Sequence, residues 1–135
     1  MSAPETGWAS WVEKADSDLL CIRNNLAAQQ VPWDAVCYHA QQVAEKMLKA
    51  YLVYHGQQPH RTHDLGALVH ECLTYDGTLS EISDACQILN PFSVDVRYPG
   101  YLLALGQAEG LPSVEAAEHI HAVILRRLQT GSHDQ

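Results

Sequence analysis

One stretch near the middle of the chain places basic and amide side chains at a regular helical spacing. Its members follow one another at steps of three or four residues: His39, Gln42, Lys46 and Lys49. At about 100° per residue they share one side of a helix, and such a row is suited to binding a phosphate or a nucleotide. It is equally typical of an ordinary solvated face, in which Glu45 and Lys49 form an i,i+4 pair. The spacing alone leaves both interpretations open.

A second polar cluster, HRTHD at 60–64, follows a loop that contains glycine and proline. Thr62 and Asp64 are residue types that begin helices, so His63 in the simplest interpretation caps or packs at a helix start. The functional interpretation is a cationic entrance to that helix, whose exposed N–H groups favour an anion. His63 and Asp64 are therefore candidate binding residues.

A third cluster, DVRYPG at 95–100, lies in the least periodic part of the chain. It places Arg97 and Tyr98 directly before a Pro-Gly turn, and loops of this kind often carry function. A structural pair between Arg97 and Asp95 explains the same residues. Arg97 and Tyr98 are the third set of candidate binding residues.

Metal-binding patterns are incomplete. His60 and His63 lie three residues apart, and Glu115 and His119 lie four apart, but neither pair has an obvious third ligand. No glycine-rich phosphate loop and no G-x-S-x-G motif occurs. We therefore predict no metal and no cofactor.

Helices must position these candidates, because apolar residues recur at three- and four-residue steps along most of the chain. We predict helices at about 8–29, 32–55, 62–76, 78–89 and 113–128. The fourth begins with a Thr78-x-x-Glu81 capping box, and the last begins after Pro112 with Ser113 as its N-cap. Part of 101–107 fits one or two helical turns. The expected fold class is all-α: one up-and-down antiparallel bundle of about five helices, a single domain over 1–135 with its core at about 8–128.

Composition limits the possible classes of protein. The chain has 135 residues, 47% of them apolar, and a formal net charge of −8, which opposes broad nonspecific nucleic-acid binding. No run approaches the ~18 apolar residues of a membrane span, and MSAPETGW lacks the features of a secretory signal. We expect a cytoplasmic protein without membrane contact. Its four cysteines are expected to be buried, reduced thiols: Cys21, Cys37, Cys72 and Cys86.

Three blocks in order, YHAQQVAEKMLKAYLVYHG, THDLGALV and RYPGY, resemble the HEPN (higher eukaryotes and prokaryotes nucleotide-binding) domain family. The resemblance covers about 8–128. It implies a compact helical bundle, usually a homodimer. It also implies a protein that often occurs beside a minimal nucleotidyltransferase in toxin–antitoxin-like or stress-response pairs.

Many members of that family are metal-independent ribonucleases with an Arg-x(4–6)-His motif. In them the arginine stabilises the negative charge of the phosphorane-like state, and the histidine assists attack by the RNA 2′-hydroxyl. Here no histidine follows Arg97 at that distance. Arg126 and Arg127 precede His133 at a suitable distance, but His133 lies in the polar tail TGSHDQ, and we interpret the match as coincidental. The resemblance thus indicates that Arg97 binds rather than catalyses.

Three hypotheses follow. The leading one is a non-catalytic HEPN module that binds a nucleotide or RNA, or docks a nucleotidyltransferase partner. The second is a ribonuclease toxin in which Arg97 works with a histidine from elsewhere, His63 or His39. The third is a dimerisation or adaptor domain, which the net charge favours. In that case Trp8, Trp11 and Trp33 would supply an interface, although core burial is the favoured explanation of these tryptophans.

Overall fold

The computed structural model describes residues 7–93 and 105–131. Over these residues the chain forms five α-helices and two short 3-10 helices, with no strand. In chain order they are α1 (Trp8–Leu26), α2 (Trp33–Tyr54), α3 (Leu65–Leu73), η2 (Gly77–Ile82), α4 (Ser83–Leu89), η3 (Asn90–Phe92) and α5 (Gln107–Gly131). The predicted all-α bundle of about five helices is confirmed.

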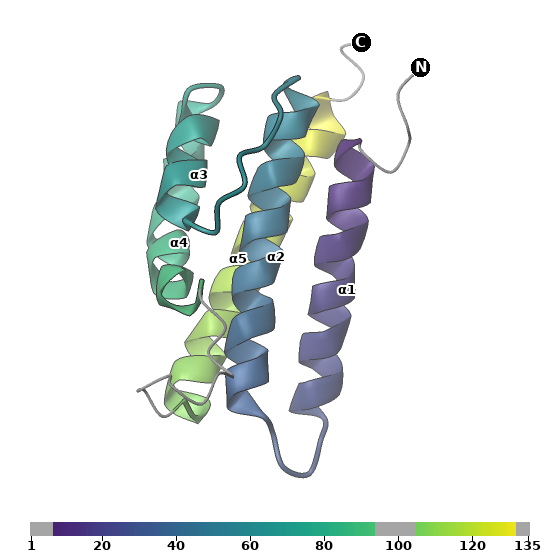
Figure 1. Cartoon of the computed structure of the whole chain (residues 1–135), viewed down its shortest axis with the longest axis vertical. Coiled ribbons are helices and arrows are strands. Elements are labelled where there is room, and N and C mark those ends of the chain that lie inside the picture. Colours follow the sequence, from purple (N-terminus) through teal and green to yellow (C-terminus); the bar gives the residue numbers. More distant parts are fainter. Residues whose placement is uncertain (1–6, 94–104, 132–135) are drawn as a thin grey trace.

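Helix α2 lies at the centre of this bundle. Its largest contacts are with α1 and α5, which hardly touch each other. In Figure 1, α1 and α2 stand side by side, α5 runs behind α2, and the shorter α3 and α4 lie on the side away from α1. The segment 55–64 runs back along α2 before α3 begins (Figure 1). Because other elements surround α2, its polar side also lies against protein.

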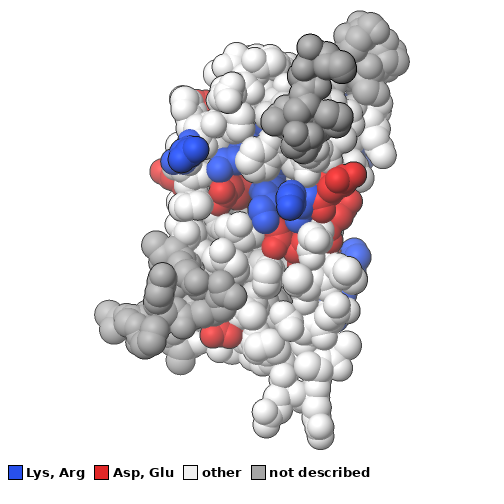
Figure 2. Space-filling model, turned by 45° about the vertical axis from the view of Figure 1, so that its right-hand side comes forward, with Lys and Arg blue, Asp and Glu red and all other residues white. Residues whose placement is uncertain are grey.

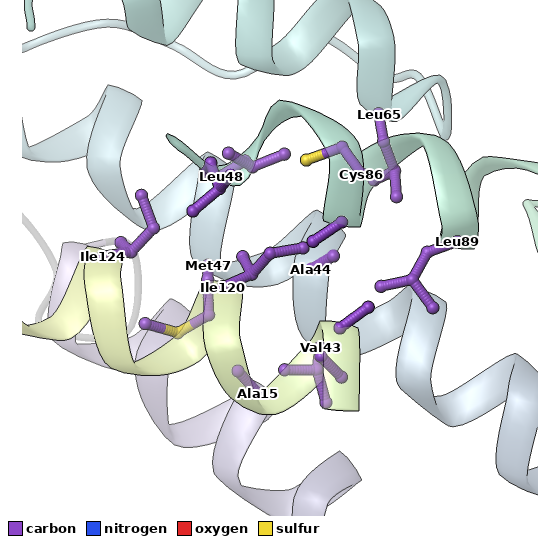
Figure 3. Packing of buried hydrophobic residues seen from close by; sticks show 14 of the residues in the cluster. Ala15, Val43, Ala44, Met47, Leu48, Leu65, Cys86, Leu89, Ile120 and Ile124 are labelled. Atoms are coloured by element: carbon purple, nitrogen blue, oxygen red, sulfur yellow. The ribbon is translucent and has the colours of Figure 1, made fainter. Parts of the chain in front are cut away.

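All five α-helices contribute buried residues to one core. Val43 and Met47 of α2 point toward Ile120 of α5, as Figure 3 shows, and all three are fully buried. The apolar face predicted for α2 is confirmed, since each of its members is at most 3% exposed: Val36, Ala40, Val43, Ala44, Met47, Leu48 and Tyr51. Helical periodicity therefore identified the core side of this helix correctly.

The start of α5 differs from the prediction. The helix begins at Gln107, and Pro112 lies inside it. The side chain of Glu109 accepts a hydrogen bond from the backbone N–H of Gly106 at 2.7 Å, which is one half of a capping box. Ser113 is not the N-cap, because it is buried and its hydroxyl donates to the carbonyl of Glu109 at 2.8 Å. The backbone N–H of Gly110 already donates to the carbonyl of Gly106 at 2.9 Å, so Pro112 lies past the first turn and removes one backbone donor from the helix.

The capping box predicted at Thr78 and Glu81 is also wrong. Residues 77–82 form η2, whose N-cap is Asp76, with its carboxylate accepting from the backbone N–H of Thr78 at 2.9 Å. Glu81 does not reach back to Thr78, because it accepts a hydrogen bond from Arg127 of α5 at 2.9 Å. A distant arginine thus replaces the local partner that the motif implied.

Helix ends elsewhere follow the sequence more closely. Helix α1 ends at Leu26, three residues before the predicted position. Gly56 ends α2 with a φ of +82°, a left-handed conformation that suits glycine. The predicted turns at 101–107 lie largely outside the described residues, and only Gln107 is seen to be helical.

The cysteines behave as small apolar side chains. All four thiols are free, and Cys37, Cys72 and Cys86 are buried, while Cys21 is half-buried. Burial raises the pKa of Cys72 and of Cys86 to about 12. Such thiols stay protonated and unreactive at neutral pH. The tryptophans are half-buried and pack against the core, as expected from the burial interpretation.

Candidate functional site

Two buried carboxylates organise the polar side of α2. Asp18 of α1 is 7% exposed and Glu45 of α2 is 5% exposed. The predicted stripe does not form a solvated face, because Lys49 is only 7% exposed and His39, Gln42 and Lys46 are half-buried. Each carboxylate holds part of the stripe through hydrogen bonds.

Asp18 joins α1 to α2. Its Oδ2 lies 2.6 Å from Nζ of Lys46, and its Oδ1 lies 2.8 Å from Nδ1 of His39. Burial raises the pKa of Asp18, but the hydrogen bonds and charges of His39 and Lys46 outweigh that effect and leave the pKa below its ordinary value. Asp18 is therefore ionised at neutral pH and holds both basic side chains in place.

Glu45 joins α2 to the segment that precedes α3. Its Oε2 accepts from Nζ of Lys49 at 2.9 Å, and its Oε1 lies 2.9 Å from Nδ1 of His63. Burial raises the pKa of Glu45, yet the hydrogen bonds from Lys49, His63 and Gln41 leave it below its ordinary value. The i,i+4 pair between Glu45 and Lys49 thus exists, but in a buried position.

Two neighbouring glutamines complete the hydrogen bonding around Glu45. Gln41 is fully buried, and its amide donates to Oε1 of Glu45 and to the backbone carbonyl of His63, each at 3.2 Å. The amide of Gln42 donates to Oε1 of Gln41 at 2.7 Å. Sequence reasoning did not select Gln41, Asp18 or Glu45 as site residues. The Gln-Gln-x-x-Glu spacing was the one available signal for two of them, whereas Asp18 required the packing of α1 on α2.

Asp64 caps α3. Its carboxylate accepts from the backbone N–H groups of Gly66 and Ala67 at 3.0 and 3.3 Å. The N–H of Leu65 donates to the side chain of Asn90 at 2.9 Å. A helix follows this cluster as predicted, but it is shorter than the predicted 62–76, since it begins at Leu65 and ends at Leu73. These three N–H groups already donate hydrogen bonds to protein atoms, so none of the three is left at the start of α3 to bind an anion.

Arg97 and Tyr98, the remaining candidates, lie outside the described residues, as does Asp95. Their assignment as binding residues stays a prediction. The structure therefore brings together five of the candidates around Asp18 and Glu45: His39, Gln42, Lys46, Lys49 and His63.

A pocket of about 600 Å³ adjoins this cluster. It lies between α1, the end of α2 and the segment after it, and Lys49 and Arg61 contribute to its wall. Figure 2 shows charged side chains of both signs gathered in one band across this face of the molecule, with mostly uncharged surface below. Sequence reasoning placed Arg61 inside the second cluster but did not choose it as a site residue.

These features define a small all-helical module with basic and amide groups fixed on buried carboxylates beside a pocket. A family model for the HEPN domain matches residues 8–128, and the chain belongs to this family. It is thereby a nucleotide- or RNA-related helical module in the general sense of that family. Neither a curated protein nor a solved structure matches the chain.

Two further findings concern metal binding and membrane insertion. In the described residues, no group of three or more histidine, cysteine or carboxylate side chains is placed to hold a metal ion. None of the described helices combines the length and the apolar character needed to cross a membrane.

Proposed function

We propose that this chain is a nucleotide- or RNA-binding module that works with a minimal nucleotidyltransferase partner in a toxin–antitoxin-like or stress-response system. It acts in the cytoplasm as a homodimer, and it is not itself a catalyst. The family supports the general class, and the polar side of α2 supports the binding role.

The observation that carries the proposal is the way Asp18 and Glu45 hold their basic partners. In each histidine Nδ1 lies within hydrogen-bond distance of a carboxylate oxygen, which leaves Nε2 of His39 and of His63 for a ligand. The ammonium group of Lys46 donates one hydrogen bond to Asp18 and has further N–H groups, and the lysine side chain is 23% exposed. Donors fixed in advance lose little entropy when they bind phosphate oxygens.

In the proposal Arg97 and Tyr98 also contact the ligand, Arg97 as a partner for a phosphate and Tyr98 as an aromatic ring for a base. Because Lys46 holds buried Asp18, replacing Lys46 would disturb packing, and Arg97 is the better test position. Arg97→Ala should weaken binding of ATP and of a short single-stranded RNA by about tenfold, the usual effect of losing one charged hydrogen bond.

Fluorescence anisotropy with labelled RNA and calorimetry with ATP measure this effect, with the exposed Arg126→Ala as the matched control. The control should bind as the unmodified protein does, and both variants should unfold at its temperature. If the unmodified protein binds neither RNA nor ATP, the proposal is wrong.

A ribonuclease is the second candidate, and the pair formed by His63 and Glu45 favours it. The buried carboxylate of Glu45 contacts Nδ1 of His63 and orients the imidazole, while the histidine side chain itself is 68% exposed. Such a histidine can take the proton of an RNA 2′-hydroxyl through Nε2. The oxygen then attacks phosphorus, the bond to the 5′-oxygen breaks, water supplies the proton of the leaving 5′-hydroxyl, and a 2′,3′-cyclic phosphate remains.

Incubation of the protein with RNA in EDTA distinguishes the two candidates. A ribonuclease leaves 2′,3′-cyclic ends, and His63→Gln abolishes them while His70→Gln, at an exposed position on α3, does not. The binding module leaves the RNA intact. We favour the latter because the Arg-x(4–6)-His motif is missing after Arg97.

A further inference from the structure

The pocket beside Glu45 has the character of a ligand site in its own right. Its wall combines apolar surface from Trp11, Val53 and Pro59 with basic groups from Lys49, His60 and Arg61. We propose that it binds a single nucleotide, with the base against the apolar wall and the phosphate at Arg61. This inference rests on the proposed binding function and gives it a specific place in the fold.

The size of the pocket suits one nucleotide. Its volume of about 600 Å³ lies within the range of roughly 300–1,000 Å³ found for small-molecule sites. A helix of duplex RNA is far larger, so the pocket admits either a free mononucleotide or the terminal nucleotide of a single strand. Both present the same chemistry, a planar base joined to a terminal phosphate.

The charge of the lining selects an anion. The chain carries a net charge of −8, yet no aspartate or glutamate lines this pocket. Lys49 is neutralised by Glu45, and His60 lies 2.6 Å from a carboxylate oxygen of Glu71. The side chain of Arg61 is exposed and makes no ion pair or hydrogen bond within 7–93 and 105–131. An exposed guanidinium with no carboxylate beside it is the preferred partner of a phosphate.

The apolar wall supplies the contact for the base. Trp11 is half-buried against the core, and Nζ of Lys49 lies 5.7 Å from the centre of its ring, so the indole is held in place. Stacking of a base on an aromatic side chain is typical of sequence-tolerant nucleotide binding. Since Glu45 holds Lys49, the buried carboxylate also fixes this wall of the pocket.

The test follows the tryptophan indole N–H signals of the full ¹⁵N-labelled chain by NMR during titration. The probes are AMP, adenosine, inorganic phosphate and a short RNA with a 5′-phosphate. The chain has three tryptophans, and Trp33, at the opposite end of α2, is the internal control. AMP and the phosphorylated RNA should shift the Trp11 signal and leave Trp33 unchanged, and adenosine and phosphate should bind more weakly than AMP. Whichever of AMP and RNA binds more tightly identifies the source of the nucleotide.

Arg61→Ala should weaken AMP binding about tenfold and leave adenosine binding unchanged. Arg126→Ala is the matched control and should bind AMP normally. Equal AMP affinity in Arg61→Ala, or a shift at Trp33 alone, would overturn the pocket assignment. ATP and RNA binding that is weakened in Arg97→Ala would still support the proposed function. Absence of binding by every probe and by ATP would overturn both.

Discussion

Nδ1 of His63 lies 2.9 Å from Oε1 of Glu45, and this contact fastens the segment before α3 to the central helix. The second oxygen of the same carboxylate holds Lys49, which forms part of the pocket wall. One buried side chain thus fixes the candidate histidine, the candidate lysine and the pocket together. Glu45 is only 5% exposed, so its buried negative charge would destabilise the fold if these partners were removed.

Asp18→Asn should lower the free energy of unfolding by about 2 kcal/mol, because it leaves the half-buried Lys46 without its counter-charge. Asp16 is the matched control. It lies on the same helix and pairs with His121 at 2.7 Å, but its side chain is 57% exposed. Asp16→Asn should therefore cost less than about 1 kcal/mol. Urea unfolding at neutral pH measures both, and equal losses would show that Asp18 has no special role.

Stability should fall in acid because of Asp18 and Glu45. Both have a pKa below its ordinary value of 3.8 or 4.5 in the folded protein, so the unfolded chain takes up protons at higher pH. Their contribution is complete above these ordinary values and is lost as the pH falls through the lower, folded ones. Urea midpoints at pH 7, 5, 4 and 3 measure this loss. The Asp18→Asn variant should show a flatter decline between pH 5 and 3, and an unchanged decline would contradict the explanation.

Gly110→Ala should destabilise the protein, although alanine normally favours a helix over glycine by about 1 kcal/mol. A Cβ atom at Gly110 would lie 2.7 Å from Cζ3 of Trp33, too close for van der Waals contact. The resulting strain should cost about 1–3 kcal/mol. Gly77→Ala, where nothing lies within 4 Å of the added atom, is the control. Thermal unfolding compares them, and a rise in stability for Gly110→Ala would show that Trp33 moves freely.

Arg127→Ala should destabilise the contact between α5 and η2 by about 1 kcal/mol. The guanidinium donates to Asp76 at 3.0 Å and to Glu81 at 2.9 Å, and its side chain is 21% exposed. Its neighbour Arg126 is exposed, so Arg126→Ala should have almost no effect. Chemical denaturation of the two variants gives the difference directly. Equal stabilities would show that the ion pairs contribute nothing.

Periodicity predicted the apolar half of the fold well because burial of an apolar face depends mainly on spacing within one helix. The face of α2 around Met47 is buried as predicted. The polar half was less predictable, since the surroundings of Lys49 depend on neighbouring segments. Spacing predicted its i,i+4 pair with Glu45, but Trp11, whose ring also lies against this lysine, comes from another helix. No periodic pattern in α2 contains this information.

Local motifs failed where a distant residue competed with the local partner. Thr78-x-x-Glu81 has the letters of a capping box, but Arg127 binds Glu81 and Asp76 caps the turn. Arg61 was missed for a related reason. Whether its guanidinium can bind a ligand depends on whether folding places a carboxylate from another part of the chain beside it. The pairing of Asp18 with Lys46 was likewise not predictable, because it requires the register of two packed helices.

The most direct test of the central claim is a map of backbone amide NMR shifts in the full chain with AMP or short single-stranded RNA in EDTA. If the polar side of α2 and its pocket bind the nucleotide, the shifts will gather at residues 39–49 and 57–63. Exposed apolar residues elsewhere, Ile88 on α4 and Leu111 on α5, should remain unchanged. No shift at saturating ligand, or shifts confined to Ile88 and Leu111, would contradict the account.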